Sequence, residues 1–178
     1  MNLEKLKQTP EEFYVFIEIP KHSRNKYEYN EELGILVLDR VLFTAYVYPC
    51  DYGFIPNTLS PDGDPIDCMV LTTEPGTPGT LVKARPIGVL IGYDEKGRDD
   101  KILAVPVENV DMRFSNIRDI KDVPAATLRE LQHFWEHMKE LEPGKWFRIE
   151  GLDGVTAAKK LVEEGIKNWT SSKGFRAT

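Results

Sequence analysis

The chain has 178 residues, enough to bury a hydrophobic core without disulfide or metal staples, and we predict one domain over residues 1–178. A content of 41% hydrophobic and 29% charged residues is that of an ordinary globular protein and excludes a disordered chain. The formal net charge of -6 argues against general nucleic-acid binding, which needs a basic surface. An anionic substrate would need local cations.

Hydropathy and cysteine content narrow the class further. No run reaches the roughly 18 apolar residues of a membrane span, and the N-terminus has no apolar signal region, so we expect a cytoplasmic protein. Cys50 and Cys68 are the only cysteines, and two cannot form a four-ligand zinc site unaided. We expect both as small buried thiols.

Short runs of apolar, β-branched and aromatic residues fill the first two-thirds of the chain, and turn residues separate them. Gly34 lies in the turn between two of these runs and indicates a hairpin. The predicted strands are residues 13–19, 26–30, 35–41, 66–72, 81–91 and 101–107.

The final third changes to a helical period. A helix is predicted to begin near Pro124, with Asp122 as its cap, and to stop at Gly144. A second helix is predicted over about 155–169. Many short strands followed by two helices predict an α+β, mainly β fold, a small barrel or curled sheet with the helices packed outside it. The apolar positions at helical spacing are Leu128, Leu131, Trp135 and Met138 in the first helix, and Ala158, Val162, Ile166 and Trp169 in the second.

Three carboxylates fall within one run of six residues, Asp62-Gly63-Asp64-Pro65-Ile66-Asp67. In an extended stretch Asp62 and Asp64 would point to the same side, because side chains alternate. Carboxylates this close repel unless a cation lies among them or one holds a proton, and hard oxygen ligands favour Mg²⁺, Mn²⁺ or Ca²⁺. From this run alone, an acidic surface turn remains an equal alternative.

Further charged or polar residues lie at the ends of predicted strands. Taken singly, each is better explained as a solvated or structural residue. Together they can converge on one mouth of a barrel. These residues are Glu18, Lys26, Glu28, Arg40, Tyr52, Asp94, Asp99, Asp100 and Lys101.

The run DGDPIDC at 62–68 resembles the signature of the family I soluble inorganic pyrophosphatases, prokaryotic type. The resemblance covers nearly the whole chain, with further blocks in the family's order. It implies a five-stranded OB-like closed β-barrel with two main C-terminal helices, Mg²⁺-dependent hydrolysis of pyrophosphate, and a homohexamer. The blocks are IEIPKHSRNKYEYN at 17–30, LDR at 38–40, YPCDYGFIP at 48–56, ARPIGVL at 84–90, DDKILAVP at 99–106 and HFWEHMKELEPGKW at 133–146.

The resemblance also implies roles for individual residues. Asp64 matches the residue that accepts a proton from the attacking, metal-activated water. Several Mg²⁺ ions per site are implied, with Mn²⁺ and other divalent ions as alternatives. The implied metal ligands are Asp62, Asp67 and Asp99, with Asp94 and Glu18 for further ions. The implied substrate-binding residues are Lys26, Glu28, Arg40, Tyr52, Lys101 and Lys139.

One position departs from the family pattern. The family usually has a Tyr before the helical Lys139, and its hydroxyl donates to phosphate, whereas here the residue is Met138. Met138 also fits the apolar stripe of the first helix, so packing is its first interpretation. Because only one hydrogen bond to a charged group would be lost, we expect a working enzyme that binds its substrate more weakly.

Two alternative functions remain open at this point. The segment His133-Phe134-Trp135-Glu136-His137 matches the H-x-x-E-H zinc-protease motif, although the resemblance places these histidines on a helix used in subunit packing. Alternatively, a non-enzymatic OB-type protein could stack single-stranded nucleic acid on aromatic residues. Those aromatic residues are Tyr46, Tyr48, Tyr52 and Phe54.

Overall fold

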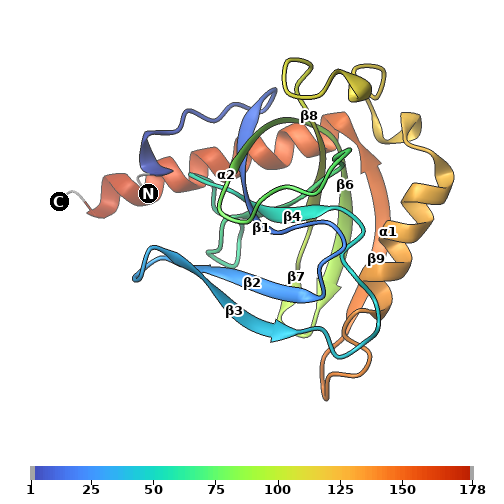
Figure 1. Cartoon of the computed structure of the whole chain (residues 1–178). Helices are drawn as coiled ribbons and strands as arrows, with labels where there is room; N and C mark the ends of the chain where they lie inside the picture. Colours follow the sequence, from blue (N-terminus) through green and yellow to red (C-terminus); the bar gives the residue numbers. More distant parts are fainter. Residues whose placement is uncertain (1–2, 177–178) are drawn as a thin grey trace.

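The computed structural model describes residues 3–176. Strands dominate the first two-thirds of the chain, and two long helices lie in the last third (Figure 1). No helix within residues 3–176 is long and apolar enough to span a bilayer. In chain order the elements are η1 (Leu3–Lys5), β1 (Phe13–Ile19), β2 (Asn25–Asn30), β3 (Ile35–Val41), β4 (Asp51–Ile55), β5 (Ile66–Val70), β6 (Leu81–Asp94), β7 (Gly97–Arg98), β8 (Lys101–Pro106), η2 (Met112–Phe114), η3 (Ile120–Asp122), α1 (Ala125–His137), β9 (Phe147–Gly154) and α2 (Val155–Arg176).

Five strands of the main sheet pair in a continuous cycle. Strand β1 pairs with β4, β4 with β5, β5 with β8, β8 with β6, and β6 again with β1. Only the β5–β8 pairing in this cycle is parallel. Strands β7 and β9 add to β6. The long β6 is therefore the strand that joins the cycle to the C-terminal part of the chain.

Alternate residues of the strands are buried on opposite faces. In β5, Met69 belongs to an apolar cluster that includes Trp135 of α1, whereas its neighbour Cys68 belongs to a cluster that includes Val162 of α2. Because side chains alternate along the strand, one face of β5 packs toward α1 and the other toward α2. Figure 1 shows the two helices in separate positions around the strands. Cys50 is buried too, and both cysteines are free thiols, as predicted.

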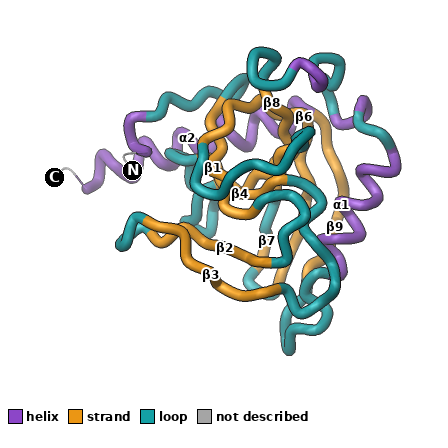
Figure 2. The backbone as a smooth tube through the Cα atoms, viewed as in Figure 1, coloured by secondary structure: helices purple, strands orange, loops and turns teal. Residues whose placement is uncertain are grey.

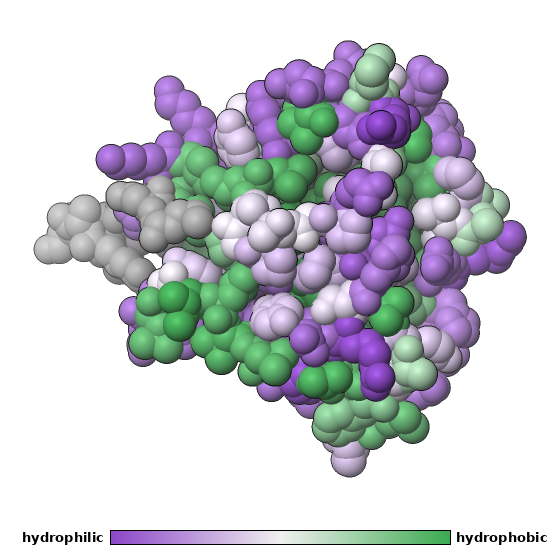
Figure 3. Space-filling model, in the orientation of Figure 1, coloured by the Kyte–Doolittle hydropathy of each residue, from purple (hydrophilic) through white to green (hydrophobic). Residues whose placement is uncertain are grey.

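The hairpin of β2 and β3 forms a separate two-stranded sheet (Figure 2). A bulge interrupts its register: Lys26 pairs with Arg40 and Tyr27 with Leu38, which leaves Asp39 opposite no residue. Large apolar side chains on and beside this hairpin remain exposed, and Figure 3 shows the resulting apolar surface along the lower edge of the molecule. They are Leu33, Ile35, Val37, Leu38, Val41, Phe43 and Val47.

Most predicted elements are confirmed, with corrections at their ends. Residues 13–19 and 35–41 form strands with the predicted bounds, whereas β4 and β9 were not predicted. The second helix begins at 155, as expected, but continues to 176. The predicted cap was wrong: Pro124 is the N-cap of α1 without a side-chain hydrogen bond, and Asp122 instead completes a capping box with Asp119 in η3.

The first helix also ends earlier than predicted. Its last residue is His137 and its C-cap is Met138, so the chain leaves the helix well before Gly144, where the stop was expected. Gly144 lies in the following turn segment with a φ of 74°. Met138 is 1% exposed, which confirms its place in the apolar stripe.

Candidate active site

One cavity of about 680 Å³ collects all of the predicted site residues. They come from β1, the β2–β3 hairpin, β4, the acidic loop and β5, the strands β6 and β8 with the connection between them, and the residues that directly follow α1. Segments distant in sequence therefore meet at one place, as the predicted convergence of strand ends required. The predicted residues that line the cavity are Glu18, Lys26, Glu28, Arg40, Tyr52, Asp62, Asp64, Asp67, Asp94, Asp99, Asp100, Lys101, Met138 and Lys139.

The acidic loop is a turn, which corrects the extended geometry expected for it. Gly63 has a φ of 94°, a conformation that favours glycine, and the Asp64 backbone N–H donates to Asp62 Oδ1 at 3.1 Å. Asp62 and Asp64 are exposed, whereas Asp67 is half-buried within β5. Burial, with the neighbouring Asp62 and Asp67 charges, raises the pKa of Asp64 above its usual range.

Glu18 reaches the cavity because β1 contains a bulge. Ile17 pairs with Gly53 and Ile19 with Tyr52, so Glu18 has no partner across the ladder. A Cβ at Gly53 would lie 1.8 Å from the Phe16 carbonyl oxygen, so this approach requires glycine. Glu18 Oε1 accepts from the Tyr29 N–H at 2.7 Å, but burial raises the pKa of the carboxyl to about 7.

Lys101 is the buried cation at the centre of the cavity and is 2% exposed. Its Nζ donates to Asp67 Oδ2 and Asp99 Oδ1, each at 2.8 Å, and to the Tyr52 hydroxyl at 3.1 Å. The ammonium also lies 4.5 Å from the ring centroid of Trp135. Burial alone would lower the pKa of Lys101, but the two aspartates hold it above its usual range. The ammonium is therefore charged.

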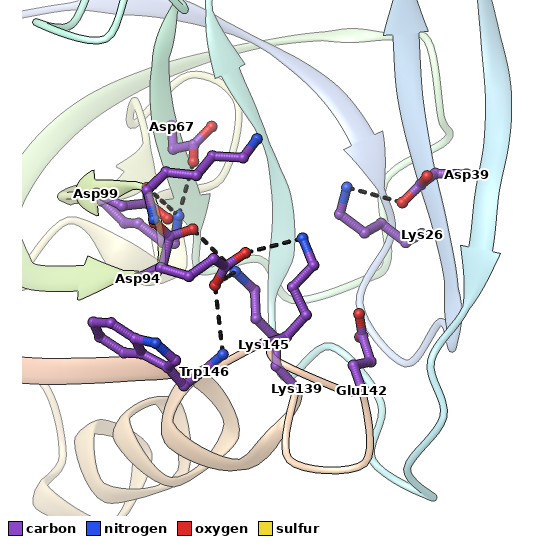
Figure 4. A network of polar contacts seen from close by, with 12 residues as sticks. Lys26, Asp39, Asp67, Asp94, Asp99, Lys139, Glu142, Lys145 and Trp146 are labelled. Carbon is purple, nitrogen blue, oxygen red and sulfur yellow. Dashed lines mark hydrogen bonds and ion pairs between the residues drawn. The ribbon is translucent and has the colours of Figure 1, made fainter.

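Paired charges also line the rim of the cavity, and Figure 4 shows several of them converging from different segments. The four basic groups of these pairs, Lys26, Arg40, Lys139 and Lys145, each meet a carboxylate. Most of these carboxylates were not predicted as site residues. The ion pairs are Lys26 Nζ with Asp39 Oδ2 at 3.3 Å, Arg40 Nη2 with Glu142 at 3.0 Å, Lys139 Nζ with Asp94 Oδ2 at 3.1 Å and Lys145 Nζ with Glu95 Oε1 at 2.9 Å.

Sequence signals for these additional residues differ. Glu95 follows the predicted Asp94 directly, and Asp39 precedes Arg40, so adjacency could have suggested both. Glu142 lies within the block at 133–146 that resembles the family, but it is 102 positions from Arg40, and nothing in that block indicates that the two side chains pair. Trp135 was not predicted as a site residue, although it lies in the apolar stripe and in the block at 133–146. Its contact with the Lys101 ammonium depends on the tertiary packing of α1.

The donor set fits a hard divalent cation. All of the predicted ligands offer carboxylate oxygens, which Mg²⁺ and Mn²⁺ prefer. The raised pKa values of Glu18, Asp64 and Asp99, caused first by burial and then by neighbouring carboxylates, show excess negative charge that a cation would relieve. Within residues 3–176 no three His, Cys, Asp or Glu side chains already form a cluster able to hold a metal, and Lys101 contacts both Asp67 and Asp99.

The two alternative functions gain no support. The rings of His133 and His137 stack at 4.2 Å, and no third ligand joins them to form a metal cluster in the described part of the chain. Tyr48 and Tyr52 are buried among other rings, so they offer no exposed stacking surface for nucleic-acid bases.

A carboxylate cavity with lysine and arginine on its rim suits a cation-assisted hydrolase of an anionic substrate. The family model described as "Inorganic pyrophosphatase" matches residues 15–170, and the chain belongs to this family. It is therefore an enzyme that hydrolyses inorganic diphosphate. The family is in general dependent on divalent metal ions.

Similar proteins match over nearly their whole length. An inorganic pyrophosphatase of Saccharolobus solfataricus is 50% identical over 167 residues, covering 94% of this chain and 97% of that protein. The solved structure of the Helicobacter pylori enzyme has a TM-score of 0.91 at 43% identity, covering 93% of this chain and 98% of that one. That of Thermus thermophilus has a TM-score of 0.91 at 45% identity, covering 96% and 99%. The mainly-β fold with two helices matches these structures.

Proposed function

We propose that the chain hydrolyses pyrophosphate to two phosphates within this cavity, with Mg²⁺ as its activating ion and Mn²⁺ as a possible substitute. The observation that carries the assignment of the site is that every predicted site residue lines the same cavity of about 680 Å³. The proposed ligands are Asp62, Asp67 and Asp99 for the main ions, with Asp94 and Glu18 for further ones. A bound divalent ion supplies Lewis-acid charge that neutralises phosphate oxygens and lowers the pKa of water.

Asp64 is the proposed general base. Its raised pKa brings the carboxylate closer to neutral pH, which suits a group that must take a proton from water. The water oxygen forms a bond to one phosphorus, the bridging P–O bond breaks, and the bridging oxygen leaves with the second phosphate. Asp64 is exposed in the acidic loop, where it can receive the proton and release it to solvent.

The basic residues are proposed to hold the two phosphates. Lys26, Arg40, Lys101 and Lys139 supply positive charge as negative charge builds on the leaving group. The Tyr52 hydroxyl is a further donor, since burial first, and then Asp67 and Asp99, raise its pKa well above the usual range and keep it protonated. Glu28 pairs with Lys26 Nζ and is proposed to orient that lysine.

The test is phosphate release from pyrophosphate as Mg²⁺ is titrated from zero, with Asp67→Asn measured in parallel. We expect no turnover in excess chelator and a saturable rise with Mg²⁺. The Asp67 variant should need more Mg²⁺ to reach its half-maximal rate, because one ligand charge is lost. Full turnover of the wild-type enzyme in chelator, or an unchanged Mg²⁺ requirement in the variant, would refute the assignment.

At the level of the whole molecule we propose one domain over 1–178, an OB-like closed barrel, a cytoplasmic location and a homohexamer. The cycle of five strand pairings supports the barrel. The exposed apolar side chains of the β2–β3 hairpin support self-association. His133 is exposed and His137 half-buried on α1, which leaves this helix available as a second contact between subunits.

A further inference from the structure

The guanidinium of Arg40 is held by carboxylates from two distant segments. Nη1 is paired with Asp39, the bulge residue of its own strand, and Nη2 is 3.0 Å from Glu142. Arg40 Nε is buried and has no hydrogen-bond partner in the described chain. Two of its three nitrogens are thus held by carboxylates of the protein. The guanidinium has five N–H donors, so donors remain for a ligand in the cavity that Arg40 lines.

Glu142 is placed for a supporting role. Its side chain is 7% exposed, which is unusual for a glutamate, and Arg40 is its ion-pair partner. Glu142 does not itself line the cavity, although Arg40 does. The carboxylate therefore holds the guanidinium from outside the lining of the cavity. Figure 4 shows Glu142 on the loop that follows α1.

The loop that carries Glu142 is itself fixed to the opposite rim. Within residues 138–146, Lys139 Nζ lies 3.1 Å from Asp94 Oδ2 and Lys145 Nζ lies 2.9 Å from Glu95 Oε1. The backbone that carries Glu142 is thus anchored at the end of β6, so Glu142 holds Arg40 from a segment other than the hairpin.

We propose that Glu142 is a positioning residue that presets Arg40 for a phosphate group of the substrate. The proposal rests on the proposed role of Arg40 in substrate binding. An arginine side chain loses much rotamer freedom when it binds a ligand, and a partner that holds it beforehand reduces that cost. Loss of the Glu142 charge should therefore weaken substrate binding and leave the Mg²⁺ requirement unchanged.

If the Glu142–Arg40 ion pair only stabilised the fold by joining the loop to the hairpin, its loss would change different measured quantities. It would lower the thermal midpoint without acting through Arg40, and its effect on KM would be the same whichever residue stands at position 40. A double-mutant cycle between the two positions separates these cases.

The experiment measures KM and kcat for magnesium pyrophosphate in Glu142→Gln, Arg40→Gln and the double variant. Glutamine keeps the shape of the side chain and an acceptor oxygen. Its hydrogen bond to arginine is weaker than that of a carboxylate, and the difference corresponds to roughly a tenfold change in a dissociation constant. We expect KM of Glu142→Gln to rise by roughly that factor with kcat nearly unchanged. In the Arg40→Gln background the same substitution should leave KM unchanged. Glu140→Gln, an exposed change on the same loop, is the control and should leave KM as in the wild type.

The outcomes distinguish this inference from the assignment of the site. If Arg40→Gln leaves KM unchanged, the substrate role of Arg40 is wrong. If Arg40→Gln raises KM but Glu142→Gln has the same effect in both backgrounds, or lowers KM, the positioning role is wrong. Should Glu142→Gln fail to fold, as judged by circular dichroism, the cycle is repeated with Glu142→Asp. That variant keeps the charge and should give a smaller rise in KM, again only when Arg40 is present.

Discussion

At the scale of single residues, the carboxylates in and beside the cavity have pKa values shifted in different directions by their surroundings. Burial and neighbouring acids raise the pKa values of Glu18 and Asp64, whereas Lys26 and Arg40, acting against burial, lower that of Asp39. Glu18, with a pKa of about 7, can exchange protons near neutral pH, and the raised pKa of Asp64 lies closer to that range than usual, whereas Asp39 remains a fixed charge. The acids that line the cavity and the acid that pairs with its basic residues are thus suited to different tasks.

Replacement of Asp64 by Asn should slow the chemical step while metal binding persists. A general base contributes about 10²–10⁴-fold to a rate, so we expect kcat to fall within that range. Mg²⁺ affinity, measured by calorimetry, should change little, because Asp64 is not a proposed ligand. Asp62→Asn, two residues away in the same exposed loop, is the matched comparison and should weaken Mg²⁺ binding. A collapse of metal affinity in Asp64→Asn would overturn this division of roles.

Glu18 should make the metal-free protein sensitive to pH. Its carboxyl has a pKa of about 7 in the folded chain and 4.5 as the reference value, so below 4.5 it is protonated in both states and has no effect. As pH rises to 7 the unfolded chain loses this proton first, and the folded state becomes less stable by on the order of 3 kcal/mol. Glu18→Gln removes this dependence and keeps an acceptor for the Tyr29 N–H.

The measurement for Glu18 is the free energy of unfolding in chelator at several pH values. The wild type should lose stability relative to Glu18→Gln between pH 4.5 and 7, and added Mg²⁺ should narrow the difference. Parallel curves for the two proteins in chelator would show that the carboxyl ionises in the folded chain at its ordinary pKa.

At the scale of elements, the end of α1 delivers Met138 to the cavity wall while packing it in the core. Met138→Tyr would add a hydroxyl beside the substrate space, and a hydrogen bond to a charged group contributes about 1.5–3 kcal/mol. We expect KM for magnesium pyrophosphate to fall at least roughly tenfold, with some loss of stability from overpacking a full site. Met138→Leu, which adds no donor, should leave KM unchanged. An unchanged or raised KM in the tyrosine variant would count against this explanation.

The bounds of regular strands could be predicted from residue type and alternation, as β1 and β3 demonstrate. Strand β4 was missed because Gly53 weakens the local signal, although close backbone approach at the β1 bulge requires that glycine. Strand β9 has glycines at 151 and 154 and pairs with β6 through a bulge, so its pattern is broken too. The predicted site residues could be found because the motifs that contain them imply roles for them. Glu142 also lies in such a block, but its partnership with Arg40 is a contact between segments far apart in sequence, which no motif indicates.

At the scale of the whole molecule, the β2–β3 hairpin would connect the proposed substrate binding to the proposed self-association. It carries Lys26 and Arg40 on the cavity, yet Val37, Val41 and Phe43 are exposed and do not line it. Among the described strands β3 pairs only with β2, so its outer edge is free for contact with another subunit. Phe43→Glu should therefore lower the oligomeric mass measured by light scattering. Met112→Glu, an exposed change in η2, should leave the mass unchanged.

If subunit contacts hold the hairpin in place, dissociation should affect substrate binding before it affects metal binding. The hairpin supplies two of the proposed phosphate-binding cations, whereas Asp62, Asp67 and Asp99 lie on other segments. We expect the dissociated Phe43→Glu protein to show a raised KM for magnesium pyrophosphate, with Mg²⁺ affinity close to that of the wild type. A dissociated variant with wild-type KM would show that each chain fixes its own hairpin, and a mass equal to that of the wild type would show that this surface is not the contact between subunits.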